Sequence, residues 1–281
     1  MLGARTAYDR GEVLVMESED RLHWRHINTL TTPQPFGYMW ECPDLFELDG
    51  QWFLAVSPQG IDCANVYGCG YFPLYGDWRG EYTLGEFHTF DCGFDFYAPQ
   101  SLAADGRRLQ FGWMAMPDAP YRGAEQAYGW QNCLTVPRVL TAAPSGHLLQ
   151  APAKELEALR GEAVQITAGE EFTAGPCFEI IAEPCGDFAL TLAKDLSLVY
   201  TEADRTITLR FASTALGCGR TERSARLASP CRKVQLIADV SSVEIFLNGG
   251  EATFTTRYYP APGPVAARLN GADALLYPLK P

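Results

Sequence analysis

The stretch "CPDLFELDGQWFLAVS" at residues 42–57 aligns with "APQSLAADGRRLQFGW" at residues 98–113, with a constant offset of 56 positions. Each stretch predicts two strands joined by a tight turn, at Asp49-Gly50 and at Asp105-Gly106. A strand–turn–strand unit that recurs at about 40–55 residues is typical of the four-stranded blades of a β-propeller. The alternative is that two unrelated hairpins share a common turn.

Most other periodic segments are also strand-like, including "DFALTLA", "TITLRF" and "VEIFLNGGEATFTT". One helix is predicted at "PAKELEALR", 152–160, because a proline opens it and Leu156 and Leu159 share a face. The alternating strands after it favour a two-sheet sandwich. We therefore predict an all-β protein with three parts: about three propeller blades in 1–150, a linker helix in 151–160 and a β-sandwich in 161–281.

The bulk composition excludes several classes of protein. The 281 residues are 47% hydrophobic, which is ample for a folded core. A formal net charge of −12, with no concentration of Lys or Arg, argues against a nucleic-acid partner. No apolar run reaches the length of about 18 residues that predicts a membrane span, and the first residues lack the layout of a signal peptide.

The nine cysteines are scattered, and none of their spacings fits a metal-binding clamp. With only four histidines, a zinc site is not expected. We expect reduced, mostly buried thiols in a cytoplasmic protein.

Glu41 lies between Trp40 and Cys42, in strongly apolar company for a carboxylate. Burial disfavours the charged form of a carboxyl group, so we expect the pKa of Glu41 to be raised. Such a side chain can hold a proton near neutral pH, as a general acid must, although an ordinary strand end can look the same.

Glu41 and Tyr97 immediately precede the two aligned stretches, so the same offset of 56 residues makes Tyr97 the counterpart of Glu41. Equivalent positions of successive blades point toward the same axial region. We therefore expect Glu41 and Tyr97 to face one funnel, with Asp95 and Trp113 close by. A carboxylate, a phenol and an indole around one concavity are typical of a sugar-binding site.

Five motifs then occur in order along nearly the whole chain: "MWECPDLF" (39–46), "FDFYAPQS" (94–101), "LQFGWM" (109–114), "CLTVPRVL" (133–140) and "DVSSVEIFLNGGEATFTTRYYP" (239–260). Together they resemble glycoside hydrolase family 32, which comprises invertases, sucrose-6-phosphate hydrolases and fructan hydrolases. The Glu-Cys-Pro-Asp motif, followed about fifty residues later by Phe-Tyr-Ala-Pro-Gln, carries the most specific part of this resemblance.

The resemblance implies a five-bladed propeller followed by a β-sandwich, and a retaining enzyme that cleaves β-fructofuranosides such as sucrose. Glu41 would be the general acid/base. Cys42 would tune that carboxyl group, Trp113 would stack on the fructose, and Tyr97 and Asp95 would line the site. An alternative for Trp113 is a core tryptophan in a buried strand. No metal or organic cofactor is implied, because carboxylates can perform both steps of this reaction.

Asp44 is expected to bind the chain rather than sugar. The choice between sucrose and its 6-phosphate is nearly open, because a phosphate would need Arg or Lys beside the funnel. Arg79 is one possible contributor, but an exposed loop arginine is the simpler interpretation.

The sequence also departs from the family pattern. The family's Asn-Asp-Pro-Asn motif, whose Asp is the nucleophile, and its Arg-Asp-Pro motif are not found in the chain. We therefore expect the chain to begin inside the second blade and to present an open propeller edge, covered by a complementary chain or a second copy. A retaining glycosidase needs two carboxylates, so the chain alone should be weakly active or inactive. Two alternatives are a non-catalytic carbohydrate-binding protein and a self-associating fragment.

Overall fold

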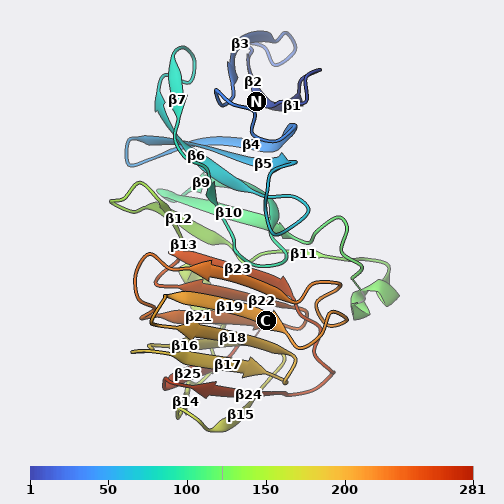
Figure 1. Cartoon of the computed structure of the whole chain (residues 1–281), viewed down its shortest axis with the longest axis vertical. Helices are drawn as coiled ribbons and strands as arrows, with labels where there is room; N and C mark the ends of the chain where they lie inside the picture. The colour runs from blue at the N-terminus through green and yellow to red at the C-terminus, as the bar shows by residue number, and fades with distance from the viewer. Residues whose placement is uncertain (122, 281) are drawn as a thin grey trace.

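The computed structural model describes residues 1–121 and 123–280, and in these ranges the chain is almost entirely β-structure. Three sheets follow one another in the N-terminal half, and two six-stranded sheets form the C-terminal part. Figure 1 shows the three sheets stacked in chain order above the six-stranded pair, with the N-terminus at the far end. The predicted fold class, propeller blades followed by a β-sandwich, is confirmed.

The first sheet contains β1 (Leu2–Arg5), β2 (Gly11–Glu17) and β3 (Arg25–Leu30). It packs on the next sheet around Trp40, which is completely buried. Gly11 permits this contact, because a Cβ atom at that position would lie 2.3 Å from the Trp40 indole. The close approach of the two sheets therefore depends on a small residue facing a large one.

The second and third sheets are two four-stranded blades, each with one short extra strand. The second contains β4 (Met39–Leu48), β5 (Gln51–Gln59), β6 (Gly70–Gly76) and β7 (Tyr82–Leu84), with β8 (His88–Thr89) on β6. The third contains β9 (Tyr97–Ala104), β10 (Arg107–Met114), β12 (Arg138–Ala142) and β13 (Leu148–Pro152), with β11 (Cys133–Leu134) on β10. A core of mainly aromatic and aliphatic side chains fills the space between these blades.

The internal repeat exists in the backbone as well as in the sequence. Both hairpins turn at an Asp-Gly pair in which the two residues have positive φ, as a type I′ turn requires. Both also contain one register shift, between Glu41 and Asp44 in the first and facing Phe111 and Trp113 in the second. The interpretation as two unrelated hairpins is therefore wrong.

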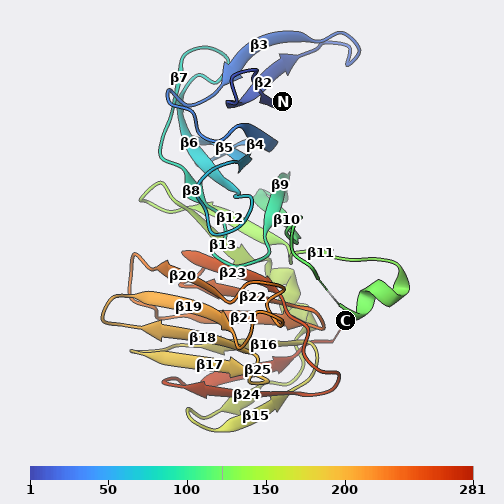
Figure 2. The same cartoon turned by 45° about the vertical axis from the view of Figure 1, so that its right-hand side comes forward.

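The sandwich consists of two antiparallel sheets whose inward side chains share one apolar core. One sheet has the order β14-β25-β16-β21-β22-β23 and the other the order β15-β24-β17-β18-β19-β20. Figure 2 shows the two sheets face to face beneath the blades. The strands are β14 (Val164–Ile166), β15 (Glu171–Ala174), β16 (Phe178–Ala182), β17 (Phe188–Leu192), β18 (Leu196–Thr201), β19 (Thr206–Phe211), β20 (Glu222–Arg226), β21 (Val234–Asp239), β22 (Ser242–Leu247), β23 (Ala252–Arg257), β24 (Val265–Asn270) and β25 (Ala274–Pro278).

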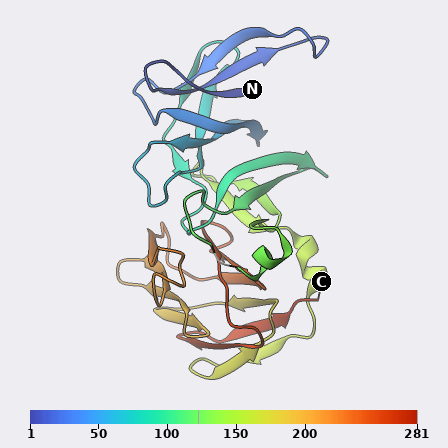
Figure 3. The same ribbon diagram turned by 90° about the vertical axis from the view of Figure 1, so that its right-hand side faces the viewer.

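The helix predicted at 152–160 is a short 3₁₀ helix, η2 (Lys154–Leu159), and it follows β13 directly. Leu156 and Leu159, three residues apart, share a face in this geometry, but none of the helix residues is buried. 3₁₀ geometry is usual in such short connectors. A second 3₁₀ helix, η1 (Ala124–Tyr128), projects from the third blade (Figure 3). No helix in the described ranges is long and apolar enough to cross a membrane.

None of the nine cysteines, all of which lie within the described residues, forms a disulfide bond. The prediction that most of them are buried is wrong, because only Cys69 and Cys231 are buried and the others are partly or fully exposed. Of these seven, only Cys42 and Cys133 lie on strands, and the other five lie in turns and connecting segments outside the cores.

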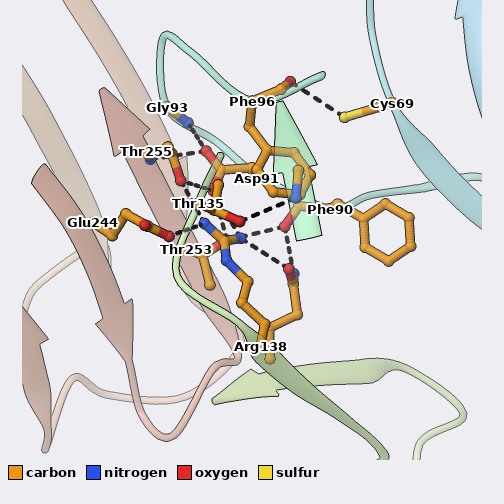
Figure 4. Close-up of polar contacts among 12 residues, drawn as sticks. Cys69, Phe90, Asp91, Gly93, Phe96, Thr135, Arg138, Glu244, Thr253 and Thr255 are labelled. Carbon is orange, nitrogen blue, oxygen red and sulfur yellow. Dashed lines mark hydrogen bonds and ion pairs between the residues drawn. The ribbon is translucent and has the colours of Figure 1, made fainter. Parts of the chain in front are cut away.

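A buried charge network joins the third blade to the sandwich (Figure 4). Arg138, with no exposed surface, donates to Asp91 at 3.2 Å and to Glu244 of β22 at 2.8 Å. It also donates to Thr255 of β23 at 2.5 Å. Burial raises the pKa of Glu244, while the Arg138 guanidinium acts in the opposite direction. The network fixes the blade that carries Tyr97 against the sandwich.

Candidate active site

Strand β4 presents Glu41 at the point where its pairing with β5 is interrupted. Glu41 faces Ser57 in the ladder and Asp44 faces Ala55, so the intervening residues form a bulge, and Cys42 has a φ of 49°. Because side chains alternate along a strand, Trp40 points into the core between blades while Glu41 points to the other side. Bulges often re-aim side chains beside active sites. Glu41 is thus held at the edge of a regular ladder.

Tyr97 reaches Glu41 from the next blade. Its phenol donates a hydrogen bond of 2.5 Å to Oε2 of Glu41. The pKa of Tyr97 is raised far above the ordinary value, first by burial and then by this hydrogen bond. The phenol therefore stays protonated and acts as a donor to the carboxylate. The predicted meeting of these two residues is present in the structure.

Trp113 lies opposite Tyr97 in the β9–β10 ladder. Directly opposed residues of antiparallel strands share a face of the sheet, so the indole and the phenol are neighbours. Trp113 is half-buried and packs against the core between the blades. This position suits both a stacking wall and a core residue, and the sugar-stacking role stays a prediction.

Two further tyrosines belong to this site, and sequence reasoning missed both. The ring of Tyr67 lies 5.7 Å from that of Tyr97, centroid to centroid. The neighbouring phenol of Tyr38 raises the pKa of Tyr67, and burial raises it further. Tyr38 could have been found from its closeness to Glu41 in sequence. Tyr67 lies in a loop without a counterpart in the repeat, so no pattern indicated it.

Cys42 lies beside the carboxylate as expected, but its fixed contact is through the backbone. Its carbonyl oxygen accepts a hydrogen bond of 2.9 Å from Nε2 of Gln100, which ties the bulge of β4 to β9. Burial raises the pKa of the Cys42 thiol, and the charge of Glu41 adds to the effect. The thiol is thus protonated at neutral pH, and its influence on Glu41 stays a prediction.

Among the described residues, no hydrogen bond or ion pair joins Asp95 to Glu41. Asp95 is completely buried, and it accepts hydrogen bonds of 2.7 Å from Arg220 of the sandwich and from the backbone N–H of Arg257. The phenol of Tyr121 also donates to it. These contacts favour a structural link between blade and sandwich, and sugar binding by Asp95 stays a prediction.

Asp44 binds the chain, as predicted. One of its oxygens accepts hydrogen bonds from the backbone and hydroxyl of Ser101, and the other is 3.1 Å from Arg108. Arg79, the possible phosphate contact, forms an exposed ion pair with Glu17 of the first sheet instead.

Two family models together match residues 1–273 of the chain. The model for the glycosyl hydrolases family 32 N-terminal domain matches residues 1–152, and the model for the glycosyl hydrolases family 32 C terminal matches residues 148–273. The fold and the matches together define the class, and the chain belongs to glycoside hydrolase family 32.

Among curated relatives, the sucrose-6-phosphate hydrolase of Staphylococcus xylosus is 38% identical over 92% of this chain and 57% of its own length. That of Bacillus subtilis is 36% identical over 94% of this chain and 59% of its own length. The chain thus spans somewhat more than half the length of these relatives. The prediction that it begins inside a blade stays a prediction.

Solved structures have the same fold. The GH32 β-fructofuranosidase of Bombyx mori is 25% identical and has a TM-score of 0.86, covering 99% of this chain and 62% of its own. The sucrose-6-phosphate hydrolase of Lactobacillus gasseri is 24% identical and has a TM-score of 0.89 over the same shares of the two chains.

Proposed function

We propose that this chain carries the acid/base half of a retaining β-fructofuranosidase site for sucrose-type saccharides, with Glu41 as general acid/base. The observation that carries the proposal is the hydrogen bond from Tyr97 to Glu41, which joins matching positions of two adjacent blades. The names of the curated relatives support the substrate class. In this mechanism Glu41 protonates the leaving glycosidic oxygen and later activates a water molecule.

Tyr97 and Trp113 have different supporting roles: Tyr97 orients Glu41, and Trp113 contacts the sugar. The protonated phenol of Tyr97 holds one carboxyl oxygen of Glu41, which leaves the other oxygen to exchange its proton with the substrate. Trp113, on the same sheet face, offers an apolar surface to the C–H groups of the sugar ring.

We further propose that the chain alone has little activity. A retaining glycosidase needs a second carboxylate about 5–5.5 Å from the first. The aspartates within the first two motifs, Asp44 and Asp95, are occupied by protein donors. General acid catalysis supplies about 10²–10⁴-fold, whereas enzymes lower barriers by about 8–23 kcal/mol in total. Glu41 alone does not provide that difference.

A phosphorylated substrate is the finer proposal. The guanidinium carbon of Arg5 lies 4.9 Å from the centroid of the Tyr38 ring, at the rim of the site. Arg5 is paired with Asp9 at 2.6 Å, so a phosphate would have to displace that carboxylate. The lack of disulfide bonds among the described cysteines fits a reducing, cytoplasmic location, where a sugar phosphate would be met. Tighter binding of sucrose 6-phosphate than of sucrose, abolished in Arg5→Ala, would support this proposal.

The exposed apolar side chains of the first sheet favour association of this chain with another polypeptide. Leu2 of β1 and Leu22 and Trp24 of the β2–β3 connection have exposed fractions of 57%, 80% and 56%. A complementary polypeptide or a second copy would cover this sheet. Light scattering on dilution distinguishes a stable dimer from a monomer.

The deciding experiment measures fructose release from sucrose by the chain and by Glu41→Gln. Glu47→Gln is a matched control, because Glu47 lies on the same strand and is exposed. We expect negligible turnover but measurable sucrose binding by tryptophan fluorescence, weakened in Glu41→Gln only. Turnover abolished by Glu41→Gln would contradict the low-activity proposal and support the acid/base role. Binding with no dependence on Glu41 would favour a carbohydrate-binding protein without catalytic function.

A further inference from the structure

We infer that Arg223, on sandwich strand β20, is a positioning residue for the candidate active site. It acts through Asn65 on the loop of residues 60–69, which carries Tyr67. The inference rests on the proposed function, because it assigns the sandwich a part in shaping the sugar site. Nothing in the motifs of the blades indicates such a part.

The hydrogen bonds between Arg223 and Asn65 cross from the sandwich to the loop. Nη2 of Arg223 donates to Oδ1 of Asn65 at 2.5 Å, and Nε donates to the same oxygen at 3.2 Å. The amide nitrogen of Asn65 donates in turn to the carbonyl of Gly93 at 3.2 Å. Asn65 therefore connects the sandwich, the loop and the segment that leads into β9.

The loop delivers Tyr67 to the site. It joins β5 to β6, and Tyr67 forms an isolated bridge with Gln59 at the end of β5. From there the Tyr67 ring contacts Tyr97, which holds Glu41. Arg223 is thus connected to the carboxylate through Asn65, Tyr67 and Tyr97, without touching the carboxylate itself.

The surroundings of Arg223 stabilise it in part, because its guanidinium carbon lies 4.6 Å from the centroid of the Phe94 ring, within range of a cation–π contact. Its guanidinium donates to neutral oxygens, those of the Asn65 amide and the Glu222 carbonyl. Burial lowers the pKa of Arg223, and the nearby positive charge of Arg220 lowers it further. A partly buried guanidinium beside a like charge costs free energy. What Arg223 supplies is two hydrogen bonds to one side-chain oxygen of the loop, Oδ1 of Asn65.

A purely structural tether between the domains would predict a different result from a positioning residue. Removing a tether lowers the melting temperature and leaves the affinity of the folded protein for sugar unchanged. Removing a positioning residue changes the loop and the affinity for sugar at temperatures where the protein is fully folded.

The test compares Arg223→Ala and Arg223→Lys with Arg226→Ala, an exposed arginine on the same strand. The measurements are hydrogen exchange of residues 60–69 by mass spectrometry and the Kd for sucrose by tryptophan fluorescence, both well below the melting temperature. We expect Arg223→Ala to raise loop exchange and to weaken sucrose binding by about tenfold each, the effect of removing one charged hydrogen bond. Arg223→Lys should recover part of both effects, and Arg226→Ala should change neither.

An unchanged Kd in a folded Arg223→Ala variant would overturn the inference, whether or not the loop is released. Asn65→Ala should give the same changes, and the double variant should add nothing to them; additive effects would also count against the inference. A wild-type chain that binds no sucrose would overturn the proposed function. In that case the exchange data alone would decide whether Arg223 holds the loop.

Discussion

The hairpins β4–β5 and β9–β10 have the same backbone and different chemistry. Both close with an Asp-Gly turn at positive φ, and both have a bulge at the same point of the ladder. At the position facing the site, the first carries Glu41 and the second Tyr97, and the two side chains bind each other. Opposite them in the ladders are Ser57 and Trp113. The repeat thus supplies the geometry, and divergence at a few equivalent positions supplies the chemistry.

The comparison extends to the third strand of each blade. In the second sheet Leu54 pairs with Phe72, and at the matching place in the third sheet Gln110 pairs with Arg138. Phe72 packs among aromatic rings between the first two sheets. Arg138 instead meets Asp91 and the sandwich (Figure 4). A blade that faces another blade uses an aromatic residue, and a blade that faces the sandwich uses a buried charge.

The largest effect is expected from breaking this charge network. Arg138→Ala leaves two buried carboxylates without their cation, which should cost about 3–5 kcal/mol of unfolding free energy. Urea denaturation followed by far-UV circular dichroism measures it. Arg107→Ala, which removes an exposed ion pair with Glu155, is the control and should be nearly neutral. A decrease below about 1 kcal/mol in Arg138→Ala would mean that apolar packing alone docks the third blade on the sandwich.

A smaller decrease is expected at Asp44, whose counterpart in the second hairpin is Gln100. The Asp44 carboxylate is mostly buried and binds Ser101 and Arg108 of the neighbouring blade. Asp44→Ala should lower the unfolding free energy by about 2–3 kcal/mol, because it removes hydrogen bonds to a charged group. Gln100→Ala removes one neutral hydrogen bond to the Cys42 carbonyl and should cost about 1 kcal/mol. Equal decreases in the two variants would contradict the view that the hairpins have diverged in their interactions.

The sequence was sufficient for the parts of the site that follow from local pattern. Two copies of an Asp-Gly hairpin predicted the register that brings Glu41 and Tyr97 together. Tyr67 could not be predicted, because an irregular loop brings it to Tyr97 and a hydrogen bond from distant Arg223 holds that loop. Long-range interactions of this kind leave no periodic signal in a single sequence.

Asp95 shows the opposite limit of sequence analysis, a residue expected at the site that the structure turns away from it. Asp95 lies two residues before Tyr97 in the sequence and is expected to line the same site. The segment before β9 is not a strand of the blade, however. The backbone N–H of Phe94 and that of Asp95 both donate to Thr255 of β23, and a Cβ on Gly93 would lie 2.3 Å from the Thr255 backbone. The sandwich therefore binds this segment, and Asp95 turns toward Arg220.

The pH dependence of the unfolding free energy tests the role of Tyr97, the residue that matches Glu41. In the folded chain the pKa of Tyr97 is raised above its ordinary value of 10, chiefly by burial. Its contribution to stability is therefore present below pH 10 and is lost as the pH rises above that value. Tyr97→Phe should cost about 1 kcal/mol at pH 7, from the hydrogen bond to Glu41, and should show a shallower decline of stability above pH 10. Tyr8→Phe, at a 93% exposed residue, is the control. Parallel curves for wild type and Tyr97→Phe above pH 10 would contradict this assignment.

The smallest effect tests the shared backbone itself. Cys42 and Ala98 occupy matching bulge positions with φ of 49° and 48°, a region that costs an L-residue about 1–2 kcal/mol. Glycine removes that strain but adds entropy to the unfolded chain, so Ala98→Gly should raise the unfolding free energy by about 0.5–1 kcal/mol. Cys42→Gly should give nearly the same increase if the two bulges are equivalent, because the hydrogen bond from Gln100 is accepted by the Cys42 carbonyl and survives the substitution. Thermal unfolding of the two single variants measures both increases. An increase at Ala98 with a decrease at Cys42 would show that the Cys42 side chain, beside Glu41, makes a stabilising interaction that its counterpart in the second hairpin does not.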